Sequence, residues 1–157
     1  MKLCMIGTGY VGLVSGVCFS DLGNTVYCVD KDENKINSLN NGNVPIYEPG
    51  LEEILKRNYI NNRLNFSSDI EASIKKSEVI VIAVGTPQGD EGMADMSSVF
   101  SVIDTISNNL NNYKVVCTKS TVPIGSGKEI VKKINKIKKN LNLFDYVSNP
   151  EFLREGS

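Results

Sequence analysis

Histidine is absent from this sequence of 157 residues. Because histidine is the side chain that most often transfers protons near neutral pH, any catalysis by this chain has to use carboxylates, lysine, cysteine, threonine or water. The imidazole ligands of many transition-metal sites are missing for the same reason, and we expect no metal site.

Long apolar runs and a cleavable leader are also absent. No apolar run approaches the ~20 residues of a membrane span, and the N-terminus does not join a basic start to a long apolar core and a small-residue cleavage site. The formal net charge of -1 gives no reason to expect binding to nucleic acid or to a membrane. We therefore expect a cytoplasmic protein with neither kind of partner.

Cysteine is scarce and shows no pairing motif. The four cysteines, Cys4, Cys18, Cys28 and Cys117, have no CxxC spacing. Each falls inside a segment that reads as a strand or a helix. We expect all four to be small buried hydrophobes rather than redox centres or metal ligands.

What the sequence does contain is a glycine motif directly after its first apolar run, Leu3–Ile6. In a dinucleotide-binding turn, a glycine at Gly7 permits a tight strand-to-helix turn, one at Gly9 lets the backbone approach a pyrophosphate, and one at Gly12 lets the helix pack closely on the strand. The N–H groups at the start of a helix over Val11–Leu22 would receive the phosphates. Glycines that serve an ordinary turn are the alternative.

An acidic residue closes the second apolar run. Thr25–Val29 reads as a strand, and Asp30 follows it directly. A carboxylate here can accept hydrogen bonds from the adenosine-ribose hydroxyls and repels a 2′-phosphate, which favours NAD over NADP. Lys31 and Lys35 weaken that preference, because nearby cations can accommodate a phosphate. Lys35 either contacts the cofactor or is an exposed lysine at a helix start.

Strands and helices alternate along the rest of the chain. We expect helices over Glu33–Leu39, from about Gly50 to Asn58, after a cap at Ser68 or Asp69, over Ser97–Leu110 and over Gly125–Lys139, and strands over Leu64–Phe66, Val79–Val84, Tyr113–Thr118 and Leu143–Ser148. Right-handed crossovers then predict an α/β Rossmann fold, a doubly wound parallel sheet of order 3-2-1-4-5-6 with helices on both faces. The lysine-rich last helix reads as amphipathic with a solvated basic face; a phosphate-binding patch is the alternative.

Ligands of such a sheet bind beyond the carboxyl ends of the strands. At one such end, Gly85, Thr86 and Pro87 either line the cofactor cleft or form a plain turn. At the next, the hydroxyls of Ser120 and Thr121 either orient a water or a substrate group or cap the following helix.

Two carboxylates follow the last strand. Glu151 and Glu155 are candidates for proton transfer and for fixing an attacking water in a chain without histidine. A solvated pair at a helix start is the alternative.

Together these motifs resemble the UDP-glucose/GDP-mannose dehydrogenase family. The matching segments are, in family order, Gly7–Gly12, Tyr47–Leu51, Gly85–Pro87, Lys119–Pro123 and Asn149–Gly156. The first segment is shared by many enzymes, whereas the last two together are highly specific. The resemblance implies oxidation of the C6 alcohol of UDP-glucose to a carboxylate, with reduction of two NAD+.

The resemblance also implies roles for individual residues. Thr121 and Glu151 match positions that hold the catalytic water, and Glu155 would help to place that water and the nicotinamide. The residues that match the cofactor site are Gly7, Gly9, Tyr10, Val11, Gly12, Asp30, Lys35, Gly85, Thr86, Pro87, Ser120, Thr121 and Glu155. Those that match the substrate site are Glu151, Phe152, Leu153, Arg154 and Glu155.

In this family the thiol that forms the covalent intermediates, a catalytic lysine and asparagine, and most of the uridine-binding surface lie in later domains. We therefore expect residues 1–157 to be the NAD-binding domain alone, without the central and C-terminal domains, and to be inactive by itself. The family's homodimers are built largely on that central region. GDP-mannose is the alternative substrate, although the segment Tyr47–Gly50 favours UDP-glucose. A non-catalytic NAD-sensing module is a further alternative, but it would have no use for Thr121, Glu151 or Glu155.

Overall fold

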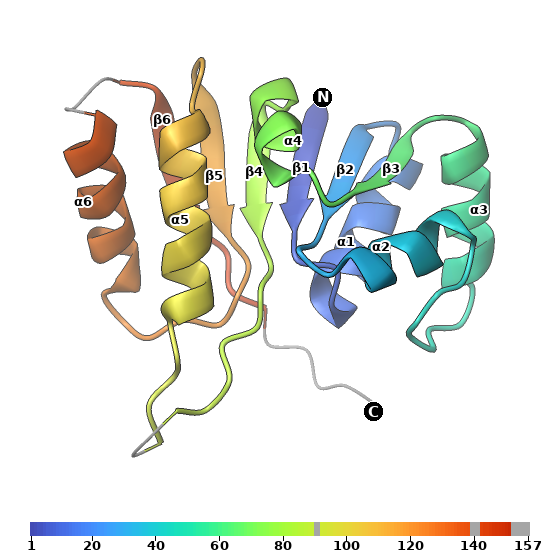
Figure 1. Cartoon of the computed structure of the whole chain (residues 1–157), viewed down its shortest axis with the longest axis horizontal. Helices are drawn as coiled ribbons and strands as arrows, with labels where there is room; N and C mark the ends of the chain where they lie inside the picture. The colour runs from blue at the N-terminus through green and yellow to red at the C-terminus, as the bar shows by residue number, and fades with distance from the viewer. Residues whose placement is uncertain (90–91, 139–141, 152–157) are drawn as a thin grey trace.

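A single parallel sheet organises the computed structural model, which describes residues 1–89, 92–138 and 142–151. The strand order is β3-β2-β1-β4-β5-β6, as predicted (Figure 1). The strands are β1 (Lys2–Ile6), β2 (Thr25–Val29), β3 (Leu64–Ser67), β4 (Val79–Ile82), β5 (Lys114–Thr118) and β6 (Phe144–Ser148). The helices are α1 (Tyr10–Asp21), α2 (Glu33–Asn40), α3 (Leu51–Ile60), α4 (Ile70–Lys76), α5 (Ser97–Asn109) and α6 (Ser126–Lys138).

Both faces of the sheet are covered by helices. Successive residues of β1 enter opposite core clusters: Leu3 and Met5 pack with residues of α1, α2 and α3, whereas Cys4 and Ile6 pack with residues of α4, α5 and α6. A strand buried on both faces needs apolar residues at every position, which explains the uninterrupted apolar runs of the inner strands. The predicted Rossmann fold is confirmed.

Helix ends follow from local hydrogen bonds. Asp69, rather than Ser68, caps α4, because its side chain accepts a hydrogen bond from the N–H of Ala72 at 2.9 Å. Helix α3 begins one residue after Gly50, whose φ of 81° lies in the left-handed region that favours glycine. Both helices therefore start within a residue or two of the predicted positions.

Strand β4 is shorter than predicted. We expected it to run to Val84, but it ends at Ile82. Its neighbour β1 leaves the sheet at Gly7, so Ala83 makes one last bond to the carbonyl of Ile6 at 2.8 Å, and no strand remains for the next residue to pair with on that side. The apolar run continues to Val84 in the sequence, but the hydrogen-bonded pairing of β4 with β1 stops before it.

The prediction that all four cysteines are buried is wrong for Cys18 and holds only in part for Cys117. Cys4 and Cys28 are buried, Cys117 is partly buried, and Cys18 is exposed. Successive helix residues are turned by about 100°, so the residue after the buried Val17 faces away from the sheet. Helical phase, and not residue type, decides the position of Cys18.

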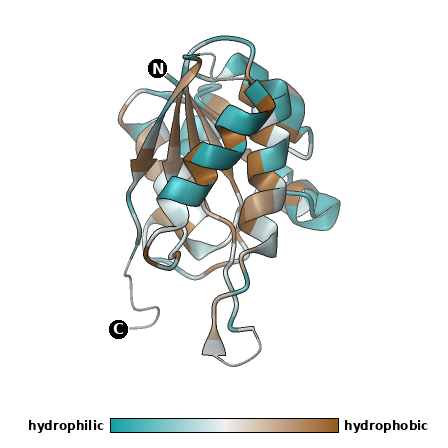
Figure 2. Cartoon of the chain, turned by 90° about the vertical axis from the view of Figure 1, so that its left-hand side faces the viewer, coloured by the Kyte–Doolittle hydropathy of each residue, from teal (hydrophilic) through white to brown (hydrophobic). Residues whose placement is uncertain are grey.

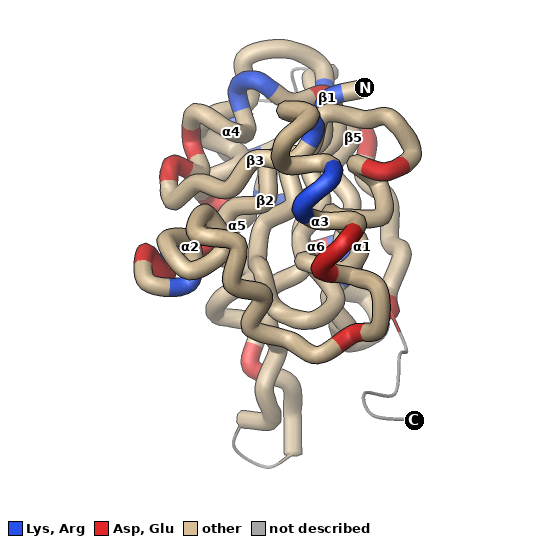
Figure 3. The backbone as a smooth tube through the Cα atoms, turned by 90° about the vertical axis from the view of Figure 1, so that its right-hand side faces the viewer, with Lys and Arg blue, Asp and Glu red and all other residues tan. Residues whose placement is uncertain are grey.

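Charged residues lie mainly on the outer surfaces. The last helix, α6, is amphipathic as predicted, with Ile130 and Ile134 buried against the sheet and hydrophilic residues outward (Figure 2). On the opposite side of the molecule, basic and acidic residues are interspersed over α2, α3 and α4 (Figure 3). There Arg57 of α3 contacts Asp21 of α1 at 2.7 Å. No helix in the described part of the chain has both the length and the apolarity to cross a membrane.

Candidate functional site

A cleft of 580 Å³ opens beyond the carboxyl ends of β1 and β4, where the strand order reverses. From there β1 leads to α1 on one face, whereas β4 leads to α5 on the other, so the two segments diverge and leave space between them. The cleft lining includes Gly7, Gly9, Asp30, Lys35, Gly85 and Ser97. The sequence predicted a ligand site at this edge of the sheet.

The glycine motif shapes the floor of this cleft. Gly7 has a φ of 101°, which favours glycine. A Cβ on Gly12 would lie 1.9 Å from the carbonyl oxygen of Gly7, so only glycine lets α1 approach the turn this closely. A Cβ on Gly9 would meet no atom within 4 Å, because Gly9 faces open space in the cleft.

The N-terminus of α1 suits an anion. Gly9 is its N-cap residue, and among the described residues no side chain caps the helix. The first turn carries no acidic residue. The positive end of the helix dipole therefore favours a phosphate at this position.

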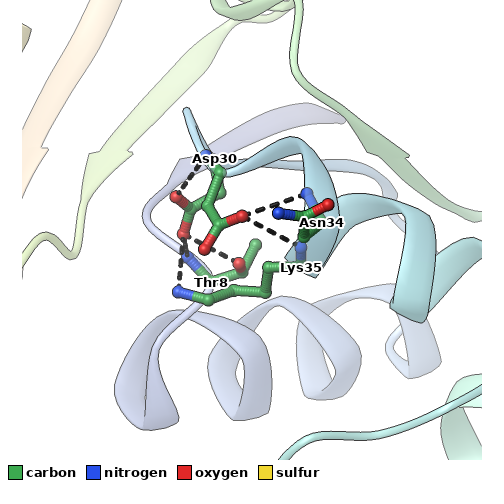
Figure 4. Close-up of polar contacts among 5 residues, drawn as sticks. Thr8, Asp30, Asn34 and Lys35 are labelled. Atoms are coloured by element: carbon green, nitrogen blue, oxygen red, sulfur yellow. Dashed lines mark hydrogen bonds and ion pairs between the residues drawn. The ribbon is translucent and has the colours of Figure 1, made fainter.

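Asp30 lies in a network of hydrogen bonds at the side of the cleft (Figure 4). Its Oδ2 accepts from the N–H and the hydroxyl of Thr8, each at 2.9 Å, and its Oδ1 accepts from the N–H of Asp32 at 3.2 Å. Burial raises the pKa of this carboxyl, but these bonds and the nearby Lys35 ammonium outweigh burial and hold the pKa below its ordinary value of 3.8. Asp30 is therefore an anion at neutral pH.

Lys35 lies beside this carboxylate. Its Nζ is 3.3 Å from Oδ2 of Asp30, and both residues line the cleft. Lys35 is thus not simply an exposed lysine at a helix start, because it lines the cleft. Its ion pair with Asp30 partly neutralises its charge. Lys31 lines the same cleft.

A second part of the cleft, of 320 Å³, is formed by the loops after β4, β5 and β6. Side-chain hydroxyls join these loops. Thr86 donates to the carbonyl of Thr121 at 2.8 Å, Ser120 donates to that of Val84 at 2.7 Å, and Thr121 donates to that of Glu151 at 2.9 Å. The alternative that Ser120 or Thr121 caps the next helix is wrong, because α6 begins only at Ser126 and their hydroxyls bond elsewhere.

Glu151 forms an ion pair that sequence reasoning did not predict. Lys119 Nζ lies 2.7 Å from Oε2 of Glu151, and their side chains are 17% and 27% exposed. The backbone N–H of Glu151 also donates to the carbonyl of Lys119 at 3.1 Å. Glu151 is therefore held at the rim of the cleft, and it is not a solvated glutamate.

The remaining predicted residues divide into three groups. Tyr10 and Val11 line the second part of the cleft with Gly9, and Tyr10 also hydrogen-bonds to Glu48. Pro87 lines neither part; its carbonyl accepts from Asp95 at 2.8 Å. Phe152, Leu153, Arg154 and Glu155 lie outside the described residues.

Helix α5 contributes a polar wall that sequence reasoning missed. Four hydroxyl residues of its first three turns line the cleft: Ser97, Ser98, Ser101 and Thr105. The available signal was the spacing of Ser97, Ser101 and Thr105, which are four residues apart along a predicted helix and so lie on one face. These hydroxyls offer hydrogen-bond partners opposite the glycine motif.

None of the four cysteines lines either part of the cleft as the structure describes it. Burial raises the pKa of Cys28 to about 12 and raises those of Cys4 and Cys117 as well. These three thiols are therefore protonated at neutral pH and are poor nucleophiles. Among the described residues no group of three or more histidine, cysteine or acidic side chains could hold a metal ion.

An uncapped helix start behind a glycine turn, with a carboxylate at the end of the neighbouring strand, defines a dinucleotide-binding domain of the Rossmann class. The family described as "UDP-glucose/GDP-mannose dehydrogenase family, NAD binding domain" matches residues 1–157. The chain belongs to this family, and its cofactor is NAD.

Curated relatives match this chain over part of their length. UDP-glucose 6-dehydrogenase TuaD of Bacillus subtilis is 53% identical over 156 residues, which are 99% of this chain and 34% of the relative. UDP-glucose 6-dehydrogenase of Rhizobium meliloti is 51% identical over an alignment of 159 positions, which covers 100% of this chain and 36% of the relative. The chain thus spans about a third of their length.

Solved structures of the family have the same fold. A ternary complex of GDP-mannose dehydrogenase from Pseudomonas aeruginosa superposes with a TM-score of 0.93 at 34% identity, over 99% of this chain and 37% of that one. A UDP-glucose dehydrogenase from Pyrobaculum islandicum gives 0.88 at 36% identity, over 99% and 37%.

Proposed function

We propose that this chain is the NAD-binding domain of a UDP-glucose 6-dehydrogenase, which oxidises the C6 alcohol of UDP-glucose to a carboxylate. The observation that carries the proposal is the meeting of Thr121 and Glu151 at the rim of the dinucleotide cleft. A domain that only sensed NAD would need the glycine motif and Asp30, but not these two residues. Relatives that share half of its residues bear the name of this enzyme.

The glycine motif and the start of α1 would hold the pyrophosphate, and Asp30 would accept a hydrogen bond from the adenine ribose. When bound, NAD+ supplies the hydride acceptor for both oxidation steps. Thr121 and Glu151 would orient a water molecule at the rim. Glu151, fixed by Lys119, would accept through that water the proton released by the C6 hydroxyl.

Residues 1–157 alone would not complete the reaction. The resemblance implies a covalent step on a thiol, and three of the four cysteines have raised pKa values while none lines the described cleft. We therefore propose that the nucleophile comes from a part of the enzyme beyond this domain. NAD binding needs no such nucleophile and is expected of the domain itself.

GDP-mannose is the second candidate substrate. It is favoured by the close superposition on a GDP-mannose dehydrogenase, with a TM-score of 0.93. The identity is lower there, at 34%, than the 53% to the Bacillus UDP-glucose 6-dehydrogenase. UDP-glucose is therefore the first choice, and direct comparison of the two substrates decides between them.

Steady-state assays of the full-length gene product test these proposals. We expect NADH formation with UDP-glucose and little with GDP-mannose, and none from residues 1–157 alone. Glu151→Gln should lower kcat by about 10²-fold to 10⁴-fold, the usual contribution of a general base, with NAD binding kept. The matched control is Glu53→Gln on the exposed surface of α3, which should leave kcat unchanged.

Three results would contradict the account separately. Faster turnover of GDP-mannose would overturn the choice of substrate. An unchanged kcat in Glu151→Gln would remove Glu151 from proton transfer. Appreciable oxidation of UDP-glucose by residues 1–157 would show that the domain carries its own nucleophile.

A further inference from the structure

The two oxygens of the Asp30 carboxylate accept different numbers of hydrogen bonds. Oδ2 accepts two hydrogen bonds from Thr8 at 2.9 Å and lies 3.3 Å from Lys35 Nζ. Within the described part of the chain, Oδ1 accepts one hydrogen bond, from the N–H of Asp32 at 3.2 Å. Since a carboxylate oxygen has two lone pairs, Oδ1 retains capacity for a ligand donor, whereas Oδ2 is already saturated.

Thr8 connects two separate strand ends. It belongs to the turn after β1, whereas Asp30 follows β2, and the two residues are 22 positions apart. The turn is pinned beside β2 by the bond from the N–H of Gly7 to the carbonyl of Val29 at 2.8 Å. Thr8 is 1% exposed, so water does not compete for its hydroxyl. Figure 4 shows both donors of Thr8 directed at the same oxygen.

Lys35 is the weaker of the two partners of Oδ2. Its contact is longer, at 3.3 Å, and its side chain is 34% exposed, so the ion pair is partly screened by solvent. The Thr8 hydroxyl bond is shorter, at 2.9 Å, and partly buried. Without that bond, the backbone N–H groups of Thr8 and Asp32 would still hold the carboxylate, but less firmly against the pull of Lys35.

We propose that Thr8, the second residue of the glycine motif, is a positioning residue for NAD: it fixes Asp30 so that Oδ1 faces the 2′-hydroxyl of the adenine ribose. The inference rests on the assignment of Asp30 to that ribose. Thr8 itself need not touch the cofactor. Gly9 leaves space for the pyrophosphate, whereas Thr8, between Gly7 and Gly9, acts on the ribose through Asp30.

Binding of NAD+ to the chain, measured by isothermal titration calorimetry, tests this inference. Thr8→Val removes the hydroxyl while keeping the size of the side chain and the backbone N–H. We expect it to weaken NAD+ binding about fivefold to tenfold, the net value of one ordinary hydrogen bond, because the backbone N–H of Thr8 still donates to Asp30. Thr8→Ser keeps the hydroxyl and should bind within about twofold of the wild type.

An analogue without the 2′-hydroxyl of the adenine ribose separates positioning from a general structural effect. Wild-type protein should bind NAD+ more tightly than this 2′-deoxy analogue, and Thr8→Val should bind the two more nearly equally. In an Asp30→Asn background, Thr8→Val should have little further effect, because the two residues act as a unit. Thermal unfolding of each variant reports whether the fold is intact.

Two outcomes would overturn the role of Thr8. One is a folded Thr8→Val that binds NAD+ as the wild type does, and the other is an equal loss for NAD+ and the 2′-deoxy analogue. Equal binding of the two ligands by wild-type protein would instead overturn the assignment of Asp30. If Thr8→Val does not fold, Thr8→Ala admits water beside Asp30 and gives the same comparisons.

Discussion

Gly9 and Gly12 belong to one motif, yet the space around them differs. A Cβ on Gly12 would lie 1.9 Å from the backbone oxygen of Gly7, so Gly12 is required by packing. A Cβ on Gly9 would enter open space in the cleft, and the φ of -71° at Gly9 suits any residue. Gly9 is therefore required only when a ligand occupies that space.

Alanine substitution separates these two requirements. Gly12→Ala should destabilise the domain by about 3 kcal/mol or more, because backbone atoms have to move. Gly9→Ala should change stability by less than about 1 kcal/mol but weaken NAD+ binding at least about tenfold, because its methyl group fills the approach to the pyrophosphate. Chemical denaturation and calorimetric titration measure the two quantities. Gly9→Ala with wild-type affinity would contradict the proposed place of the pyrophosphate.

At the scale of single residues, the sequence predicts those roles that depend only on the spacing of residues close together in the chain. Gly7, Gly9 and Gly12 were assigned because turn geometry fixes their separation along the chain. The contacts of Thr8 with Asp30 and of Lys119 with Glu151 join residues 22 and 32 positions apart. Such contacts depend on which strand ends lie side by side and how the side chains turn there, which residue types alone do not specify.

Polar contacts also hold elements together at the amino ends of the strands, opposite the cleft. Lys114, the first residue of β5, is completely buried. Its Nζ donates to the carbonyl of Ser77 at 2.5 Å and to Oδ1 of Asn112 at 2.7 Å. Burial lowers its pKa. Because Ser77 is the C-cap of α4, this lysine satisfies a helix end and ties α4 to β5.

Removal of this ammonium group should loosen the contact between α4 and β5. Lys114→Met keeps most of the side-chain volume but leaves the Ser77 carbonyl without its donor, at a cost of about 1–3 kcal/mol in the free energy of unfolding. Lys132→Met on the exposed face of α6 is the matched control and should change it by less than about 0.5 kcal/mol. Urea denaturation gives both values. Equal stability of Lys114→Met and the wild type would show that the buried lysine contributes nothing.

At the scale of elements, the order of strands and helices follows from sequence, whereas some ends do not. The apolar run through Val84 predicts a longer β4, yet the strand stops at Ile82, where β1 turns away. Sequence shows the apolar run, but the end of a strand also depends on its partner. The same limit applies to Lys114, since no local pattern marks a lysine that caps a helix in another element.

In the whole molecule, the cleft lies between two differently built walls. One wall is the glycine turn and the start of α1, with backbone N–H groups for an anion. The other is the hydroxyl-bearing face of α5, and Asp30 and Lys35 lie at the side. The loops after β4, β5 and β6 continue the cleft toward Glu151, where the proposed chemistry would take place.

We propose that this cleft binds NAD through the glycine motif and Asp30. The most direct measurement is a titration of the 15N-labelled chain with NAD+, followed by NMR of the backbone amides. We expect saturable shifts that cluster at Gly7–Gly12, Asp30, Gly85 and the start of α5, and that are weakened in Asp30→Asn. Contradiction would come from unchanged spectra at millimolar NAD+, or from shifts clustered elsewhere, such as the groove between α6 and β6 lined by Val131 and Tyr146.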